Sequence, residues 1–185
     1  MARPSSTEVV LVGRVPAEVF GELDSLPNVR AIRLRQAEQD GVDETEQEAR
    51  AHSFAGSVHG PYAVHDVDPL HDVGRAWISY FDESAPVGTL EVAVEALLGR
   101  LRRGAAALPD YFVVVEPESL PVTERHWWLG AVSAAAPSRV VPAPATASGI
   151  AHVLGALPSG GWWPEDQATW LRGLASVIPD RVGRV

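Results

Sequence analysis

Hydrophobic and polar residues alternate along the chain with two different periods, and the period changes from segment to segment. A β-branched run over residues 8–15 predicts a strand, and Pro16 then opens a short helix. Over residues 29–35 apolar positions alternate with arginines, which predicts a half-exposed strand at a sheet edge. The unbroken apolar run over residues 111–115 predicts a strand that helices cover on both faces.

The second half of the chain carries most of the helical periodicity. Residues 75–81, RAWISYF, are rich in aromatic and β-branched side chains and predict a further strand. Strands that alternate with helices indicate a three-layer α/β/α sandwich with a mainly parallel sheet of four to six strands. The helices are expected over residues 88–103, 123–136 and 148–157 and from Pro164 onwards, with a short strand at residues 139–141.

A polar stretch interrupts this pattern at about residues 37–72, within a chain of 185 residues whose length suits a single domain, residues 1–185. Residues 37–56 are acidic and poor in large hydrophobic side chains, which is typical of either a solvated helix or a mobile insertion. Residues 57–72 are broken by proline and glycine. We therefore expect a polar, acidic insertion or loop at residues 37–72, with fast amide exchange in its first half.

The composition excludes several kinds of chemistry. The chain has no lysine and no cysteine, so its 15 basic residues are all arginine. Schiff-base and pyridoxal phosphate chemistry, the lysine of a P-loop, thiolate nucleophiles and disulfides are therefore ruled out. A net charge of −9 with scattered arginines argues against nucleic acid as a partner, and no apolar stretch is long enough to span a membrane. The absence of cysteine fits a reducing compartment, so we expect a cytoplasmic location.

Histidines and aspartates gather in the polar stretch. Imidazole and carboxylate groups are ligands that zinc and manganese accept, although the spacing here matches no known zinc motif. A bound divalent metal is therefore one hypothesis, and side chains that occupy an exposed loop without any cofactor are the expected alternative. The metal hypothesis rests on His59, His65, His71, Asp66 and Asp68, with His52 and Asp72 nearby in the sequence.

A second candidate site follows from the fold class, because ligands of open α/β sheets bind beyond the carboxyl ends of the strands. If the predicted strands are neighbours, up to four carboxylates converge there with one arginine as counter-charge, and such crowding raises a pKa or recruits a cation. In the alternative arrangement the glutamates after residue 115 point apart into water. The only hydroxyl at these ends lacks the small flanking residues of a nucleophile elbow. The residues of this crevice are Arg14, Asp82, Glu83, Glu116, Glu118 and Ser119.

Two tryptophan pairs, Trp127 with Trp128 and Trp162 with Trp163, form a candidate binding surface. Adjacent residues of a helix project about 100° apart, so both rings of the first pair cannot face the centre of one apolar stripe. The second pair lies between glycine and proline. We expect at least one indole of each pair to be partly exposed, as is typical of binding hot spots, whereas a large α/β interface would bury both.

Two short stretches, FDESAPVGTL from Phe81 and FVVVEPESLPVTER from Phe112, resemble segments of the anion-pump ATPases of the arsenite and tail-anchor type. Together they cover about 24 residues, their separation is shorter than in that family, and the family's lysine-bearing phosphate loop is missing. The resemblance implies a degenerate nucleotide-binding-type domain that does not hydrolyse ATP.

These observations favour a non-enzymatic α/β domain that acts through contacts with a protein partner, as a regulator, adaptor or inhibitor, or through self-association. An acidic composition, the tryptophan pairs and the lack of a complete catalytic set support this hypothesis. Two alternatives stay open. One is a metal-dependent hydrolase that uses the His/Asp cluster at residues 52–72 or the acidic crevice, and the other is a small-molecule binder, including a non-hydrolysing nucleotide-binding-type domain.

Overall fold

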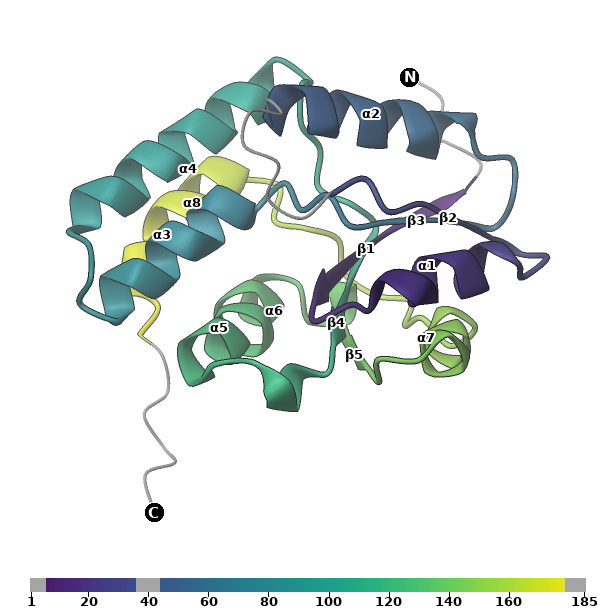
Figure 1. Ribbon diagram of the computed structural model, residues 1–185. Helices are drawn as coiled ribbons and strands as arrows, with labels where there is room; N and C mark the ends of the chain where they lie inside the picture. Colours follow the sequence, from purple (N-terminus) through teal and green to yellow (C-terminus); the bar gives the residue numbers. More distant parts are fainter. Residues whose placement is uncertain (1–5, 36–43, 179–185) are drawn as a thin grey trace.

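The computed structural model describes residues 6–35 and 44–178, which form a five-stranded, all-parallel sheet with helices on both faces (Figure 1). The strand order is β2-β3-β1-β4-β5, so β1 lies in the centre and β2 and β5 lie at the edges. This arrangement confirms the predicted three-layer α/β/α class with a parallel sheet. None of the helices in the described ranges has the length and apolar character needed to cross a membrane.

The central strands are the most apolar segments of the sheet. β1 (Thr7–Gly13) and β4 (Tyr111–Val115) pair side by side, and all five residues of β4 are buried. The unbroken apolar run predicts this burial because helices cover a central parallel strand on both faces. β3 (Tyr62–His65) pairs with the other side of β1, and the edge strands are β2 (Val29–Ala31) and β5 (Val140–Ala143). The first three residues of the segment that alternates with arginines therefore form an edge strand, as predicted, whereas residues 32–35 of the predicted strand lie outside it.

Each face of the sheet has its own hydrophobic core because successive side chains of a strand point to opposite faces. Val9, Leu11 and Val113 belong to the face that α1 (Ala17–Asp24) and α7 (Ala147–Leu154) cover. α1 begins directly after Pro16, as the sequence predicts.

The opposite face carries the larger core and most of the helices (Figure 1). Val10 and Phe112 pack there against leucine, valine and tryptophan side chains. The helices on this face are α2 (Glu44–Ser57), α3 (His71–Phe81), α4 (Val87–Arg102), α5 (Val122–His126), the π-helical turn Trp127–Val132, α6 (Ser133–Ala135) and α8 (Gln167–Arg172), with short 3-10 turns at Pro117–Ser119, Pro137–Arg139 and Gly173–Ser176.

The predicted strand at residues 75–81 is wrong, because these residues belong to α3. Its buried residues Val73, Ala76 and Trp77 recur three and four positions apart, which is the period of a helix that packs on one side. A window of seven residues is too short to show this period, since the first turn of α3 lies upstream of it. Considered alone, the aromatic and β-branched side chains of this window favour a strand.

The described part of the predicted polar insertion or loop at residues 37–72 begins at residue 44 and consists largely of regular elements. It contains α2, β3 and the start of α3. α2 matches the solvated-helix alternative, because it buries Ala51 and Ala55 while most of its other side chains are exposed. Such small buried side chains give the sequence no strong hydrophobic stripe. Residues 37–43 of the predicted mobile segment lie outside the described residues.

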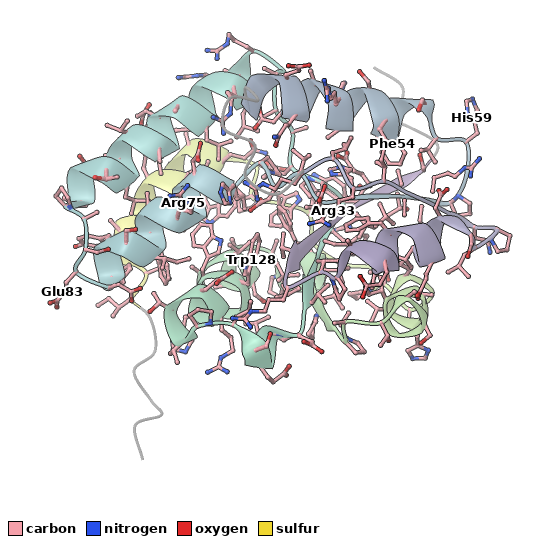
Figure 2. The ribbon with its side chains drawn as sticks, viewed as in Figure 1. Arg33, Phe54, His59, Arg75, Glu83 and Trp128 are labelled. Atoms are coloured by element: carbon pink, nitrogen blue, oxygen red, sulfur yellow. The ribbon has the colours of Figure 1, made fainter. Side chains whose placement is uncertain are left out.

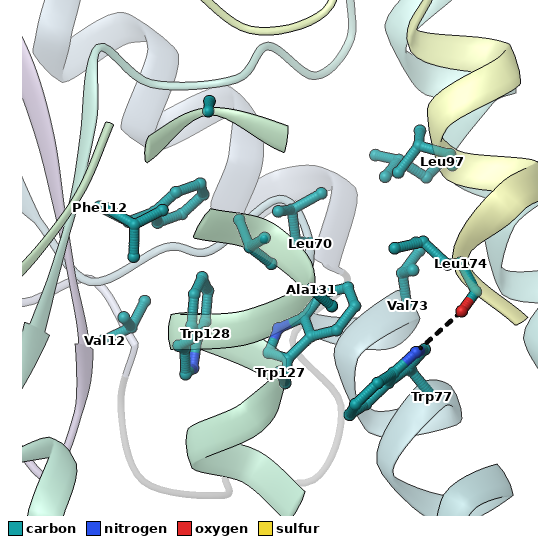
Figure 3. Packing of buried hydrophobic residues seen from close by; sticks show 14 of the residues in the cluster. Val12, Leu70, Val73, Trp77, Leu97, Phe112, Trp127, Trp128, Ala131 and Leu174 are labelled. Atoms are coloured by element: carbon teal, nitrogen blue, oxygen red, sulfur yellow. Dashed lines mark hydrogen bonds between the residues drawn. The ribbon is translucent and has the colours of Figure 1, made fainter. Parts of the chain in front are cut away.

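Trp127 and Trp128 are both buried, so the predicted exposure of one indole in this pair is wrong (Figure 3). Their helical turn lies between the sheet and α3, so one ring packs against the sheet and the other packs against α3. The ring centroid of Trp128 lies 5.0 Å from that of Phe112 in β4, and the centroid of Trp127 lies 5.5 Å from that of Trp77 in α3. α3 approaches closely at Gly74, where a Cβ would lie 2.7 Å from Trp127 Nε1.

In the second pair one indole is exposed, as predicted. Trp163 is buried, and its indole N–H donates a hydrogen bond to the carbonyl of Pro109 at 2.7 Å. Trp162 is 45% exposed, and the guanidinium carbon of Arg139 lies 4.3 Å from its ring centroid. Of the four tryptophans in the predicted binding surface, Trp162 alone is exposed.

Candidate functional site

At the centre of the sheet, neighbouring strands are followed by helices on opposite faces, and α/β proteins bind ligands at such points. The chain leaves β1 through α1 on one face, whereas it leaves the neighbouring strands β3 and β4 through helices on the other face. Ligands of open α/β sheets bind at such switch points, beyond the carboxyl ends of the strands. The carboxyl edge of the sheet, around the ends of β1 and β3, is therefore the candidate site. Figure 2 labels two of its side chains, Arg33 beyond β2 and Arg75 on α3.

Gly13 shapes the end of β1. Its φ of +88° lies in the left-handed region, and a Cβ at this position would lie 2.7 Å from the carbonyl oxygen of Val115 in β4. Glycine is therefore required, and the next residue, Arg14, is exposed at the edge. Burial raises the pKa of the Glu124 carboxyl on α5, and the nearby Arg14 guanidinium opposes this rise. These two residues are thus the charged groups beside the end of β1.

Asp66, directly after β3, holds the segment that follows β2. Its Oδ1 accepts hydrogen bonds from the backbone N–H groups of Leu34 at 2.7 Å and Arg35 at 2.9 Å. Its Oδ2 lies 3.9 Å from Arg33 Nε. The carboxylate is therefore used to place Arg33 and Arg35 at the carboxyl edge.

Asp68 begins the connection from β3 to α3. Its Oδ1 accepts a hydrogen bond from the Leu70 N–H at 2.8 Å. Burial raises the pKa of the Asp68 carboxyl to about 7, against the opposing effects of this hydrogen bond and of Arg35. The negative charges of Asp72 and Glu48 add to the rise. Asp68 therefore exists in both protonated and ionised forms at neutral pH.

His71, the first residue of α3, shows the opposite shift. Burial lowers the pKa of its imidazole to about 4, and the positive charges of Arg35 and Arg75 contribute while Asp72 opposes them. The imidazole is therefore neutral at pH 7. A neutral histidine beside a partly protonated carboxyl group provides both donors and acceptors of hydrogen bonds. Strongly shifted pKa values of this kind are concentrated at functional sites.

A small hollow lies between the first turns of α2 and the start of α3. Its volume is about 20 Å³, which is enough for one water molecule and too small for an organic ligand. The hollow is lined by Arg35, Gln47, Glu48, Val67, Asp68, His71, Asp72 and Arg100.

The residues of the metal hypothesis are held by other interactions or lie apart. His59 is exposed before the amino end of β3, whereas His71 follows its carboxyl end; Figure 2 shows His59 far from α3. His65 is buried, with Nδ1 accepting a hydrogen bond from the Val67 N–H and Nε2 lying 3.0 Å from Glu8 Oε1. Within the described ranges, no three histidine, aspartate or glutamate side chains are placed so that they could hold a metal ion.

The acidic crevice is also arranged differently from the prediction. Asp82 and Glu83 follow α3, so their predicted position at the end of a strand is wrong. Glu116, Glu118 and Ser119 do follow β4, and all three are exposed. The Ser119 hydroxyl donates a hydrogen bond to the carbonyl of Glu116 at 2.8 Å. This part of the edge therefore presents carboxylates to solvent.

Several charged residues of the edge escaped the sequence analysis, among them Glu48, Arg35, Arg75 and Arg100. Glu48 precedes the buried Ala51 by three positions, so the helical period of α2 places a carboxyl group on its buried side. This period is the signal that could have identified Glu48. Arg75 escaped because the segment that contains it was predicted as a strand.

The fold and this edge define an open, parallel α/β protein with a charged carboxyl edge. Comparison of the chain with protein-family models, with curated proteins and with solved structures gave no match. The two stretches that resemble anion-pump ATPases lie around the turn from α3 to α4 and along β4 to α5. The resemblance therefore stays an expectation from the sequence.

Proposed function

We propose that this chain is a non-enzymatic α/β domain that binds a small anionic ligand at the carboxyl edge of its sheet, between the ends of β1 and β3. The observation that carries the proposal is that two guanidiniums from separate segments, Arg35 after β2 and Arg75 on α3, are near enough to His71 to help lower the pKa of its imidazole, and that Arg35 lines the same hollow as His71. Arg33 and Arg14 lie at the same edge. Arginines gathered at a switch point favour an anion, even in a protein with a net charge of −9.

The protonation states at this edge support the same ligand class. A protonated Asp68 and a neutral His71 both present hydrogen-bond donors to an anion without adding negative charge. The Ser119 hydroxyl is bonded to a backbone carbonyl rather than to a base, so it lacks the activation that a nucleophile needs. These groups favour binding without catalysis. The proposed function needs no metal cofactor, and the proposed location is the cytoplasm.

Titration with inorganic pyrophosphate at low ionic strength tests the proposal, with thermal melting and calorimetry as readouts. A ligand that binds the folded state raises the melting temperature by mass action, and about 2.7 kcal/mol is gained at one hundred times Kd. We expect this rise in the wild type and its loss in a variant carrying Arg35→Gln and Arg75→Gln. Arg102→Gln removes an exposed arginine at the end of α4 and is the matched control. Equal effects of the two variants, or no binding by the wild type, would contradict the proposal.

A second candidate function is the protein-contact domain that the composition favours, and Trp162 is the observation for it. Its indole is exposed and lies over the guanidinium of Arg139, which also lies 4.8 Å from the Tyr111 ring centroid. An ordered, exposed indole is typical of a hot spot. Sedimentation of the wild type and of Trp162→Ala over a range of concentrations tests self-association. A monomer at every concentration in both proteins would exclude this form of contact.

A further inference from the structure

α2 is attached to the sheet by few apolar side chains, of which Phe54 is the one large ring and lies edge-on to the ring of His65, with 6.4 Å between the centroids. Ala51 and Ala55 are its buried hydrophobic residues, and the half-buried Phe54 packs with Val58 and Ala63. Alanine side chains remove little apolar area from water, so this attachment contributes less than the leucine and tryptophan contacts of α3 and α4. α2 is therefore weakly held by hydrophobic contacts.

A charged group supplies the other attachment of α2. Glu48 is only 9% exposed, and its Oε1 lies 3.3 Å from Arg100 Nε at the end of α4. Figure 1 shows the first turns of α2 beside this end of α4. Arg100 also lies 3.9 Å from Asp72 Oδ2 on α3. The buried Glu48 carboxylate thus connects α2 to α4 directly, and to α3 through Arg100.

The second oxygen of Glu48 is buried and finds no hydrogen-bond donor among the described residues. The side chain lines two water-sized hollows, one of about 20 Å³ beside Asp68 and Asp72 and one of about 30 Å³ beside Glu8 and His65. A buried carboxylate oxygen without a donor destabilises the ionised form of the group. The position of Glu48 is therefore unfavourable to its negative charge.

We propose that α2 is a proton-controlled cover, which is docked when Glu48 and Asp68, at the hollow that they line together with Asp72, hold one proton between them and loosens when that proton is lost. The proposal does not depend on the ligand proposed above.

The balance of charge around the hollow supports this control. Three carboxyl groups face two guanidiniums, so one bound proton leaves two negative charges against two positive charges, and its loss leaves an excess negative charge in a buried place. Burial raises the pKa of Glu48 and, more strongly, raises that of Asp68 to about 7. The charged and titratable groups around Glu48 are Arg100 of α4, Asp72 and His71 of α3, Asp68, Arg35 after β2, His52 of α2, Glu8 of β1 and His65 of β3.

The direction of the pH dependence follows from these raised pKa values. A carboxyl group whose pKa is higher in the docked state stabilises docking at low pH, and this stabilisation is lost as the pH rises through the docked value. Asp68 sets that value at about 7. Loosening of α2 exposes Ala63 and His65 of β3 but leaves the large cores on both faces of the sheet in place.

Amide exchange measured by mass spectrometry on the whole protein, from about pH 5.5 to 8.5 and corrected for intrinsic rates, tests the proposal. We expect protection of α2 relative to β4 to fall as the pH rises from about 5.5 to about 7, by up to about tenfold per pH unit, and to change little above that pH. Glu48→Gln keeps the shape of the side chain but removes one negative charge, so it should keep α2 protected at every pH. Glu46→Gln changes an exposed partner of Arg50 and should behave like the wild type.

Two outcomes would overturn the proposal. Protection of α2 in the wild type that does not change with pH shows that docking is not linked to protonation. Loss of α2 protection at every pH in Glu48→Gln shows that the ion pair with Arg100 is a simple anchor. If Glu48→Gln does not fold, Asp68→Asn replaces it, because this variant removes the carboxyl group whose pKa is raised to about 7 and should flatten the pH dependence.

Discussion

Folding moves a proton between two residues of the connection after β3. In an unfolded chain at about pH 5.5 the aspartate is ionised and the histidine is protonated. In the folded protein Asp68, with a pKa of about 7, holds a proton and His71, with a pKa of about 4, is neutral. The folded and unfolded states thus bind the same number of protons at these two positions. Their effects on stability cancel between about pH 4 and 6.5.

Single substitutions should reveal the two opposing effects. Asp68 stabilises the folded state most below its unfolded pKa of 3.8, and His71 stabilises it most above 6.5. Asp68→Asn should therefore make the free energy of unfolding rise with pH between about 4 and 6.5, relative to the wild type, by at most about 1.4 kcal/mol per pH unit. His71→Asn should make it fall over the same range. Urea denaturation at several pH values measures both slopes, and slopes of the same sign would refute the assignment.

The tryptophans give a second prediction for single residues. Trp127 lies between two helices in the larger core, so Trp127→Ala should cost about 3–5 kcal/mol of stability. Trp162→Ala removes an exposed ring and its contact with Arg139, and should cost about 1 kcal/mol or less. Thermal and urea denaturation compare the two variants. Similar losses in both would show that the exposure of these rings is described wrongly.

Among the elements, β4 contributes buried side chains to both cores and has all of its residues buried. Val114 is fully buried, and Val114→Asp would place an unpaired charge between the sheet and its helices. We expect a loss of at least about 5 kcal/mol, which equals the whole stability of a domain at the lower end of the ordinary range. Val92→Asp on α4 is the matched control, because the same substitution there affects a side chain that is 72% exposed. Circular dichroism should show a folded control and an unfolded Val114→Asp variant.

The contrast between α3 and β4 shows how far elements can be predicted from local patterns. The run at residues 111–115 is apolar at every position and consists of aromatic and β-branched side chains, which together favour a strand covered on both faces over a segment of a buried helix. Residues 75–81 contain side chains that suit either a strand or one side of a buried helix. The choice depended on the preceding turn and on Trp77, which packs against Trp127 from another part of the chain.

For the whole molecule, the strand order predicts a gradient of stability from the centre to the edges. β1 and β4 each pair with a strand on both sides and have buried side chains, whereas β2 has three residues and a single neighbour. Amide exchange should therefore be slowest in β1 and β4 and markedly faster in β2. Mass spectrometry of peptides from each strand measures this order. Equal protection of β2 and β4 would show that the sheet opens only as one unit.

The sequence alone determined the fold class, the central strand β4, the edge position of β2 and several of the helices, because hydrophobic periodicity reports directly which side of an element is buried. Tertiary structure decided the charged edge, since Arg35, Glu48, Asp68 and Arg100 come from segments far apart in the chain and meet only after the strands are ordered. It also decided the burial of Trp127 and Trp128, because a residue is exposed or covered according to what packs against it. Periodicity describes one element at a time, whereas the pKa values and the covered surfaces of this protein depend on distances between elements.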